Sequence, residues 1–415
     1  MSKKCFLPVI IGIVICILMT GCLKNEEKDT KKPVSYDSLM QDFKENATES
    51  ELTCWYTEEA DKEWLTDISG LFNKEYGIKV NLIYYDGVSL FEDMNSANQK
   101  GNGPDVYICG NDQLEFARNS GLLSVNEYYD DAFWKDHYPE VSKKAVTFKD
   151  VQYGYPVYFD TYCLVYDAGL LDSAPASMDD ILAFADEYSD TGSTKAILRW
   201  DVADPYINTM FLAAYGDIFG ENGDDASAFQ IYNEKTVETM TYFNSLSEYM
   251  WMDKNNISHD IVKDRIKEGT LVLGICKSDI LPVLQSQDSY EISYIPSLTD
   301  TLSSKPYSTT YIAMVNPYTA DESAANMFAC YLSMGHPEKQ YEGNGKLPVV
   351  NEKDDFDKFQ SVLYAQYLNS CPVPKVMVFG DYLSESSIMF DNIWDGKDVE
   401  EQLSTLQKTM EERIN

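Results

Sequence analysis

Histidine is scarce in this chain: only His137, His259 and His336 occur among its 415 residues. They are dispersed and lack the spacing of metal ligands, which excludes most zinc enzymes and argues against a Ser-His-Asp triad. The GxSxG nucleophile elbow and the GxxxxGK[ST] phosphate loop are absent as well. Residues 391–396 resemble only half of a calcium loop. We therefore expect no catalytic residue, no metal site and no cofactor.

Positive charge is also in deficit, with 33 Lys and Arg against 68 Asp and Glu and a formal net charge of −35. Nucleic-acid binding needs a basic stripe, so we expect no nucleic-acid partner. Such acidity keeps a protein soluble and self-repelling, and it would also suit a cationic ligand. Paired carboxylates of the kind that a glycosidase needs arise by chance among 68 acidic residues, so they do not indicate an enzyme.

The nine cysteines form no C-x-x-C pair, which argues against zinc ribbons and thioredoxin-like redox sites. Two fall within the first 16 residues and a third is Cys22. Six are spread singly through the rest of the chain: Cys54, Cys109, Cys163, Cys276, Cys330 and Cys371. Most of these stand in or beside apolar runs, where a free thiol behaves as a small buried hydrophobe. We expect mostly free thiols, with disulfides as the alternative.

The first 22 residues have the order of a secretory signal peptide. Lys3 and Lys4 precede an apolar run over 6–19, and Thr20-Gly21-Cys22 follows as a small-residue cleavage site. The L-M-T-G-C sequence resembles a bacterial lipoprotein box, which implies cleavage after residue 21 and a lipid on Cys22. The alternative is an uncleaved membrane anchor, but the run is short of the roughly 20 residues that a span requires. We expect a lipid-anchored protein on the extracellular face of the bacterial cell membrane.

The segment 22–48 is polar and mixed in charge, so we interpret it as a flexible tether. Cleavage of the 415-residue chain after residue 21 leaves 394 residues, enough for two domains or three. Aromatic residues make up 13% of the chain, with 30 tyrosines, which is too many for a disordered protein. Tyrosine offers a flat apolar face with a hydroxyl at its edge, which suits a binding surface.

The first predicted secondary-structure elements after the tether are a strand, a helix and a second strand within about thirty residues. Residues 52–56 read as a buried strand, and 64–76 repeat apolar residues at helical spacing until Gly77. Residues 78–85 form the second strand, so the pattern predicts a βαβ unit in a parallel sheet. Further strands are expected at 105–109, 162–166, 270–276, 291–295 and 309–315. Helices are expected at 114–121, 179–188, 237–250 and 399–414.

Polar residues interleaved with aromatics lie near the ends of the expected strands. They are Thr57, Glu58, Glu59, Asn111, Asp112, Asp160, Asp204, Tyr206, Tyr307 and Tyr311. Some follow the strands over 52–56 and 105–109, one precedes the strand over 162–166, some open a helix at 204–206, and two flank the late strand over 309–315. Ligands of open α/β sheets bind in the crevice outside the carboxyl ends of the strands. The alternative for each of these residues is a solvated position in a loop.

Five segments, taken in order, resemble ABC-transporter extracellular solute-binding proteins of the maltose-binding type. They are GNGPDVYICGNDQLEFARNSGLLSVNEY from residue 101, YGYPVYFDTYCLVYDAGLL from residue 153, DPY at 204–206, EGTLVLGI from residue 268 and GKLPVV at 345–350. The resemblance implies an α/β fold of the two-lobed, type II periplasmic-binding-protein class, with parallel-sheet lobes joined by hinge crossover strands around a ligand cleft. The N-terminal lobe would hold 49–158 and 309–347, and the C-terminal lobe 159–308 and 348–415.

The resemblance also implies pocket positions at Asp112, Asp160, Asp204 and Tyr206, with Glu59 near the first sugar contact. Tyr307 flanks a late strand, and Phe379 and Tyr382 are the nearest candidates for the family's late aromatic platform. The chain departs from the family pattern at three other places. Cys109 and Gln113 stand where the family has tryptophan and arginine, and the position of a later tryptophan falls near Ser278 or Asp279. These departures argue against maltose itself and leave room for another carbohydrate.

The function that the resemblance implies is capture of a carbohydrate, most simply an oligosaccharide, by a subunit of an ABC importer. A sugar offers hydroxyls to carboxylates and an apolar C–H face to tyrosine or phenylalanine. The partners would be permease subunits in the membrane, which the protein touches through its lipid only, and we expect a monomer. Two alternatives stay open: a cationic solute such as a polyamine in the same fold, and a sugar-sensing lipoprotein that feeds a receptor.

Overall fold

The computed structural model describes residues 34–189, 195–351 and 356–415. The expected signal peptide and the lipidation residue Cys22 lie outside these ranges. None of the helices in the described ranges combines the length and apolarity that a bilayer crossing requires.

The N-terminal lobe is built on three parallel strands. β1 (Glu51–Tyr56) lies between β2 (Lys79–Tyr84) and β3 (Val106–Gly110), and α2 (Asp61–Tyr76) connects β1 to β2. The helix ends at Gly77, whose φ of 77° is a left-handed conformation that glycine adopts without a Cβ clash. The predicted βαβ unit is therefore confirmed.

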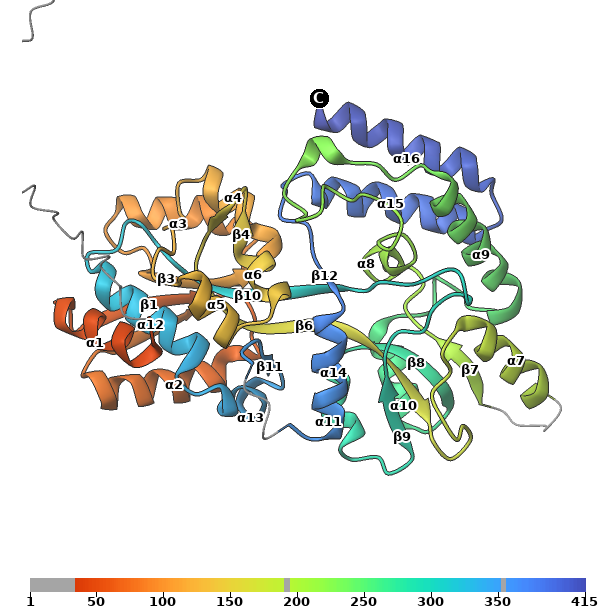
Figure 1. Ribbon diagram of the computed structural model, residues 1–415, viewed down its shortest axis with the longest axis horizontal. Helices are drawn as coiled ribbons and strands as arrows, with labels where there is room; N and C mark the ends of the chain where they lie inside the picture. The colour runs from red at the N-terminus through yellow and green to blue at the C-terminus, as the bar shows by residue number, and fades with distance from the viewer. Residues whose placement is uncertain (1–33, 190–194, 352–355) are drawn as a thin grey trace, which may run out of the picture. The chain divides into compact units, whose positions relative to one another are not determined.

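Two long strands cross from this lobe into the next. β10 (Tyr307–Val315) runs antiparallel to β3 and to the first half of β6 (Tyr155–Asp167). From Tyr162 onward β6 pairs instead with β8 (Leu271–Lys277), and from Leu164 also with β9 (Tyr290–Ser293). Since β6 belongs to both sheets, it joins the two lobes, as Figure 1 shows. The sequence predicts parallel sheets, and the structure adds antiparallel pairing at these crossovers.

The C-terminal lobe combines the far half of this sheet with long helices. β7 (Ala196–Arg199) is parallel to β8, and α7 (Met178–Ser189), α9 (Glu234–Met250) and α10 (His259–Lys267) belong to the same lobe. α15 (Phe379–Trp394) packs on α16 (Val399–Ile414), which buries Leu403, Leu406 and Met410. The helices expected at 179–188, 237–250 and 399–414 are confirmed.

Two short strands tie the later chain to the crossovers. β11 (Leu347–Pro348) pairs with β6 at Phe159 and Tyr158, and β12 (Cys371–Pro372) pairs with β10. The remaining helices are α3 (Leu90–Gln99), α4 (Leu114–Asn119), α5 (Asp131–His137), α6 (Glu140–Val146), α8 (Pro205–Asn208), α11 (Leu281–Leu284), α12 (Glu322–Met334), α13 (Gln340–Asn344) and α14 (Lys358–Leu368). β4 (Thr147–Phe148) and β5 (Val151–Gln152) form a separate small hairpin.

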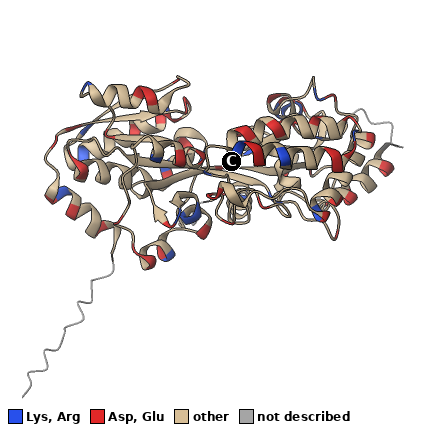
Figure 2. Cartoon of the chain, turned by 90° about the horizontal axis from the view of Figure 1, so that it is seen from above, with Lys and Arg blue, Asp and Glu red and all other residues tan. Residues whose placement is uncertain are grey.

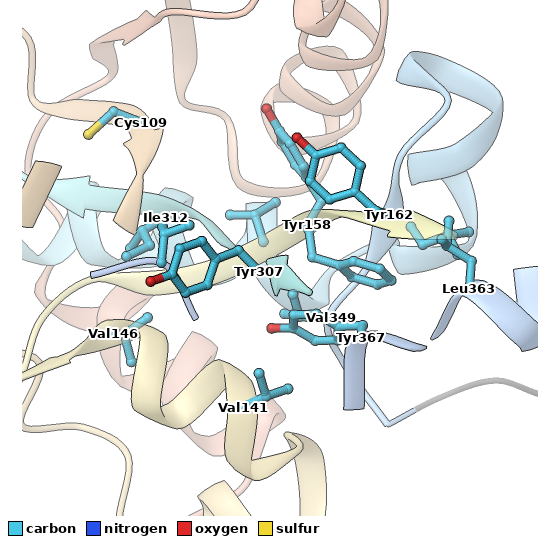
Figure 3. Close-up of a cluster of buried hydrophobic side chains, with 14 of the residues drawn as sticks. Cys109, Val141, Val146, Tyr158, Tyr162, Tyr307, Ile312, Val349, Leu363 and Tyr367 are labelled. Atoms are coloured by element: carbon cyan, nitrogen blue, oxygen red, sulfur yellow. The ribbon is translucent and has the colours of Figure 1, made fainter. Parts of the chain in front are cut away.

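The crossover strands are lined by buried aromatic rings on both faces (Figure 3). Tyr158 and Tyr162 rise from one face of β6, because residues four apart in a strand share a face. On the opposite face Phe159 stacks on Tyr367 of α14, with ring centroids 4.0 Å apart. The crossover is therefore held by packed rings from several segments of the chain.

An extra helix, α1 (Tyr36–Asn46), precedes β1 and packs against α12. Ser35 and Ser38 form a capping box at its start, and it buries Leu39, Met40 and Phe43. The prediction of a flexible tether over 22–48 is therefore wrong for 36–46, because three apolar residues at helical spacing suffice to anchor a mostly polar helix.

Acidic residues are distributed over the helices of both lobes (Figure 2). The six cysteines of the described chain are all free, and five of them are buried. The prediction of mostly free thiols is therefore confirmed. Burial raises the pKa of the Cys163 thiol to about 12, so it is un-ionised at neutral pH.

Candidate functional site

A cavity with a volume of about 720 Å³ takes its walls from both lobes and the crossover strands. Its lining residues come from strand ends, crossover strands and the start of α8. They are Thr57, Glu58, Tyr84, Tyr85, Asp86, Gly87, Val88, Leu90, Cys109, Gly110, Asp112, Gln113, Asp160, Thr161, Tyr162, Asp204, Pro205, Tyr206, Lys277, Thr309, Tyr311 and Leu383. Five carboxylates and one lysine thus share a wall with five tyrosines.

The N-terminal wall is formed by loops that follow β1, β2 and β3. Because these strands are parallel, their carboxyl ends meet at one edge of the sheet. Tyr311 donates a hydrogen bond of 3.2 Å to Glu58, and its ring stacks on Tyr158 at 4.6 Å between centroids. The position of Glu58 is therefore set by the crossover strands behind it.

Behind this wall lies the buried carboxyl of Asp61, in the first turn of α2. It accepts hydrogen bonds from the Tyr158 hydroxyl at 2.6 Å and from Asn344 at 2.7 Å. Burial raises the pKa of Asp61 to about 6, against these two hydrogen bonds, which lower it. Asp61 does not line the cavity, but it holds Tyr158, and the lining residue Tyr311 stacks on the ring of Tyr158.

Asp112 lies in the turn after β3, beside the cavity. Gln113 donates a hydrogen bond of 2.5 Å to its Oδ2 atom. Burial raises the pKa of Asp112, while the Gln113 contact lowers it in part. The neighbouring Asn111 fixes the turn, since its side chain accepts from the Thr310 backbone and donates to the Val373 carbonyl.

Asp160 stands on β6, between the lobes, and is already engaged by protein groups. Lys346 lies 3.0 Å from its Oδ2 atom, and Ser278 donates a hydrogen bond to Oδ1. Burial alone would raise the pKa of Asp160, but the positive charge of Lys346 and the Ser278 hydroxyl outweigh it and hold the pKa below its usual value. Asp160 therefore lines the cavity as an ionised carboxylate, and Lys346 and Ser278 already occupy part of its hydrogen-bonding capacity.

Asp204 and Tyr206 form the C-terminal wall at the start of α8. The Asp204 carboxylate caps the helix by accepting from the Tyr206 backbone at 2.9 Å, and Pro205 occupies the first helical turn. The Tyr206 hydroxyl lies 2.5 Å from Thr309 Oγ1 on β10. This contact joins the C-terminal wall to a crossover strand.

The structure places the eight sequence-predicted ligand residues in two groups. Asp112, Asp160, Asp204 and Tyr206 line the cavity together. Glu59, Tyr307, Phe379 and Tyr382 do not line it.

The four residues outside the lining have other surroundings. Glu59 is exposed before α2, next to the lining residue Glu58. Tyr307 and Phe379 are buried behind Tyr206, with ring centroids 5.8 and 6.3 Å from its ring, and Tyr382 stacks on Phe379. The three aromatics therefore support Tyr206 from behind.

Sequence reasoning missed the lining residues that follow β2 and β8. Tyr84, Tyr85 and Asp86 end or follow β2, so the same strand-end rule applies to them. Lys277 is the last residue of β8, and its ammonium lies 5.9 Å from the Tyr162 ring. Val88 and Leu383 carried no sequence signal, because nothing in a sequence distinguishes an apolar residue at a cavity rim from one in the core.

The family departures at Cys109 and Gln113 both fall in the cavity lining. Burial raises the pKa of the Cys109 thiol, so it offers a small apolar surface where an indole would fill space. Ser278 binds Asp160, and Asp279 is paired with His259 at 2.7 Å and Lys263 at 2.9 Å. Neither of the two residues after β8 supplies an aromatic face.

Chemically, the cavity offers carboxylate acceptors, phenol hydroxyls and flat tyrosine faces. None of the three histidines lines it, and no cluster of metal-binding side chains occurs in the described part of the chain. The arrangement suits reversible binding of a polyhydroxylated molecule, which donates many hydrogen bonds and presents apolar C–H faces.

Residues 71–353 match the sequence profile of the family described as bacterial extracellular solute-binding protein. The chain belongs to this family. The match covers about two thirds of the sequence. It takes in β6 and the strands that pair with it, β8, β9, β10 and β11, so it includes the crossover region on which the cavity is built. The family resemblance inferred from the five sequence segments is thereby confirmed.

Curated relatives extend the match over most of the chain. The maltodextrin-binding protein MdxE of Bacillus subtilis is 24% identical over 80% of this chain and 83% of its own length. A maltooligosaccharide ABC transporter solute-binding lipoprotein of Streptococcus pneumoniae is 23% identical over 77% and 78%. A galactooligosaccharide-binding protein of B. subtilis is 23% identical over 57% of this chain and 53% of its own length.

Solved structures show the same two-lobed fold. A cyclo/maltodextrin-binding protein in complex with maltotetraose aligns with a TM-score of 0.77 at 17% identity, covering 89% of this chain and 98% of its own. The maltose-binding protein MalE of Listeria monocytogenes, in complex with maltose, aligns with a TM-score of 0.76 at 21% identity, covering 88% and 97%. The predicted fold class is therefore confirmed.

Proposed function

We propose that this protein is the solute-binding subunit of an ABC importer and captures a carbohydrate, most simply an oligosaccharide, in the cavity between its lobes. The observation that carries the proposal is the joint placement of Asp112, Asp160, Asp204 and Tyr206 around one 720 Å³ cavity. Relatives named for maltodextrin, maltooligosaccharides and galactooligosaccharides support a carbohydrate over a cationic solute such as a polyamine.

The proposal includes a division of the chain into lobes near the predicted positions. β6 changes sheets between Thr161 and Tyr162, close to the predicted boundary at 158/159. The predicted boundaries at 308/309 and 347/348 fall within β10 and β11. Each boundary thus lies in a crossover strand or in a strand paired with one, where a small change of backbone angles would move one lobe against the other.

The proposal also gives the protein a place at the cell surface. A lipid on Cys22 would hold it on the extracellular face of the membrane, and its partners would be the permease subunits that receive the ligand. The Streptococcus pneumoniae relative is named as a lipoprotein, which supports this placement. We infer that the protein works as a monomer and leaves its ligand chemically unchanged.

Isothermal titration against maltose, maltotriose, maltotetraose, a galactooligosaccharide and spermidine tests the ligand class. We expect a carbohydrate to titrate and spermidine not to. We expect Asp204→Asn and Tyr206→Ala to weaken the affinity about tenfold or more, a loss of about 1.4 kcal/mol or more. Asn retains helix-capping capacity, so Asp204→Asn should unfold at an unchanged temperature.

Matched controls replace the same residue types away from the cavity. Asp264→Asn on α10 and Tyr318→Ala, whose side chain is exposed, should leave the affinity unchanged. Equal affinity in the Asp204→Asn, Tyr206→Ala and control variants would show that the ligand binds elsewhere. Titration by spermidine alone would overturn the carbohydrate proposal.

A further inference from the structure

The loop between β2 and α3 is rigidly built, although it lies at the rim of the cavity. The Tyr85 ring stacks on Trp55 with 5.7 Å between centroids and 9° between planes. Its hydroxyl donates to Asp93 at 2.8 Å and accepts from the Ser89 backbone at 3.1 Å. A Cβ atom at Gly87 would come within 2.5 Å of that hydroxyl, so the turn requires glycine. The loop is thus held in one shape by its own contacts.

At the tip of this rigid loop, Val88 is fully exposed, at 103% of its reference surface. The other exposed large apolar side chains in the described ranges keep at least part of their surface covered. Val88 takes no part in the contacts that hold the loop, and it lines the cavity. An aliphatic side chain placed in water by a pre-organised loop gains free energy only when something covers it.

Leu383 lines the same cavity from the other lobe. It lies in the first turns of α15, one residue after the buried Tyr382, so its position is fixed by the helix core. Val88 and Leu383 are the aliphatic side chains, with Leu90 and Pro205, in a lining otherwise rich in carboxylates and tyrosines. Val88 comes from the N-terminal lobe and Leu383 from the C-terminal lobe, so closure of the lobes would bring both against one part of the ligand.

We propose that Val88 and Leu383, one from each lobe, form an apolar clamp that closes on one C–H face of the bound carbohydrate. The inference rests on the proposed function and specifies how one end of the ligand is recognised. Carboxylates bind the hydroxyl edge of a sugar, but they discriminate poorly against water, which donates equally well. An aliphatic pair does not form hydrogen bonds with water, and it packs well only against a sugar ring that presents C–H groups instead of hydroxyls. The clamp therefore determines which sugars bind.

The clamp is tested by titrating the best-binding carbohydrate of the panel into Val88→Ser, Leu383→Ser and the double variant. Each single variant should weaken binding about fivefold to tenfold, since part of a Val or Leu side chain loses its apolar cover. The heat-capacity change of binding should become less negative, because less apolar surface is buried. The double variant should lose less affinity than the sum of the single variants, because both residues cover the same face of the ligand.

Matched controls carry the same chemistry away from the cavity. Val125→Ser is the same substitution at a partly exposed site in the N-terminal lobe, and Ile388→Ser changes an exposed aliphatic residue on α15 itself. Both should bind with unchanged affinity and heat-capacity change. Val88 is fully exposed, so Val88→Ser should unfold at the wild-type temperature, which excludes misfolding as the cause of a loss.

The outcomes separate the clamp from the proposed function. Unchanged affinity in Val88→Ser and Leu383→Ser, with weakened binding in Asp204→Asn, would overturn the clamp and leave the function standing. Fully additive losses would show that the two residues act on separate faces, which also contradicts the clamp. If no carbohydrate titrates into the wild-type protein, the function and the clamp fail together.

Discussion

At the scale of single residues, the cavity holds its carboxylates in different states. Burial raises the pKa of Asp112, whereas the Lys346 ion pair and Ser278 hold that of Asp160 down against its burial. One carboxylate oxygen of Asp204 accepts the hydrogen bond that caps α8. Each carboxylate therefore keeps some acceptor capacity for a ligand while it also makes contacts within the protein.

Asp61 gives a pH dependence with a defined sign. Its pKa is about 6 in the folded protein and about 3.9 in an unfolded chain, so between these values the folded state binds more protons. The free energy of unfolding should therefore fall as the pH rises from about 4 to about 6, by at most about 3 kcal/mol from this group. Asp61→Asn removes the titration and should stabilise the protein at neutral pH.

Chemical denaturation of both proteins at about pH 4 and about pH 7.5 isolates the effect, because the other carboxylates are common to the two. The stability advantage of Asp61→Asn should shrink toward the lower pH. An advantage that is equal at both pH values would contradict a raised pKa at Asp61.

A cavity-lining residue can be predicted from the sequence when the course of the backbone alone determines where its side chain lies. The strand-end rule locates Asp112, because the end of a strand is visible in a sequence. Asp160, inside β6, and Asp204, at the start of α8, are predicted by the family resemblance instead. Glu59 and Glu58 stand side by side in the sequence, and only the turn before α2 decides that Glu58 faces the cavity. The direction of Tyr307, Phe379 and Tyr382 depends on tertiary packing, which places them behind Tyr206 instead of on the cavity surface.

At the scale of elements, α1 shows how few apolar residues order a polar segment. Phe43 is almost fully buried, and its ring meets Tyr128 edge-on with 4.8 Å between centroids. The segment after the helix is fixed by Asp321, whose carboxylate accepts from the Thr48 and Glu49 backbones and caps α12. Composition alone hides such a helix, because most of its side chains are charged or polar.

Phe43→Ala tests whether α1 is part of the folded body. We expect it to lower the free energy of unfolding by about 3 kcal/mol, since a buried phenylalanine leaves a cavity. Asp42→Ala, which changes an exposed residue of the same helix, should have little effect. Equal stability of the two variants in denaturant titrations would show that α1 does not contribute to the folded body and that the segment is a tether.

The βαβ unit, β3 and the long terminal helices could be predicted because their apolar periodicity is local. The continuous course of β6 could not, since its two halves pair with different sheets and its length of 13 residues joins lobes that sequence patterns treat separately. β11 and β12 have two residues each, too few for any periodicity. Both depend on contacts with β6 and β10 that only the folded chain provides.

At the scale of the whole molecule, the proposed function requires movement of one lobe against the other about the crossover strands. Contacts such as Lys346 with Asp160 and Tyr206 with Thr309 connect the lobes to these strands on the cavity side. A ligand that touches both walls favours the closed arrangement by as much as its contacts differ between the two states. Under the proposed function, a permease would distinguish this closed arrangement from the open one.

Small-angle X-ray scattering with and without saturating carbohydrate tests whether the two lobes close on the ligand. The radius of gyration should decrease on addition of the best-binding carbohydrate of the panel. It should stay constant for the Asp204→Asn, Tyr206→Ala double variant at the same carbohydrate concentration. An unchanged radius of gyration for the wild-type protein, under conditions where calorimetry shows it to be saturated, would contradict capture by closure of the two lobes.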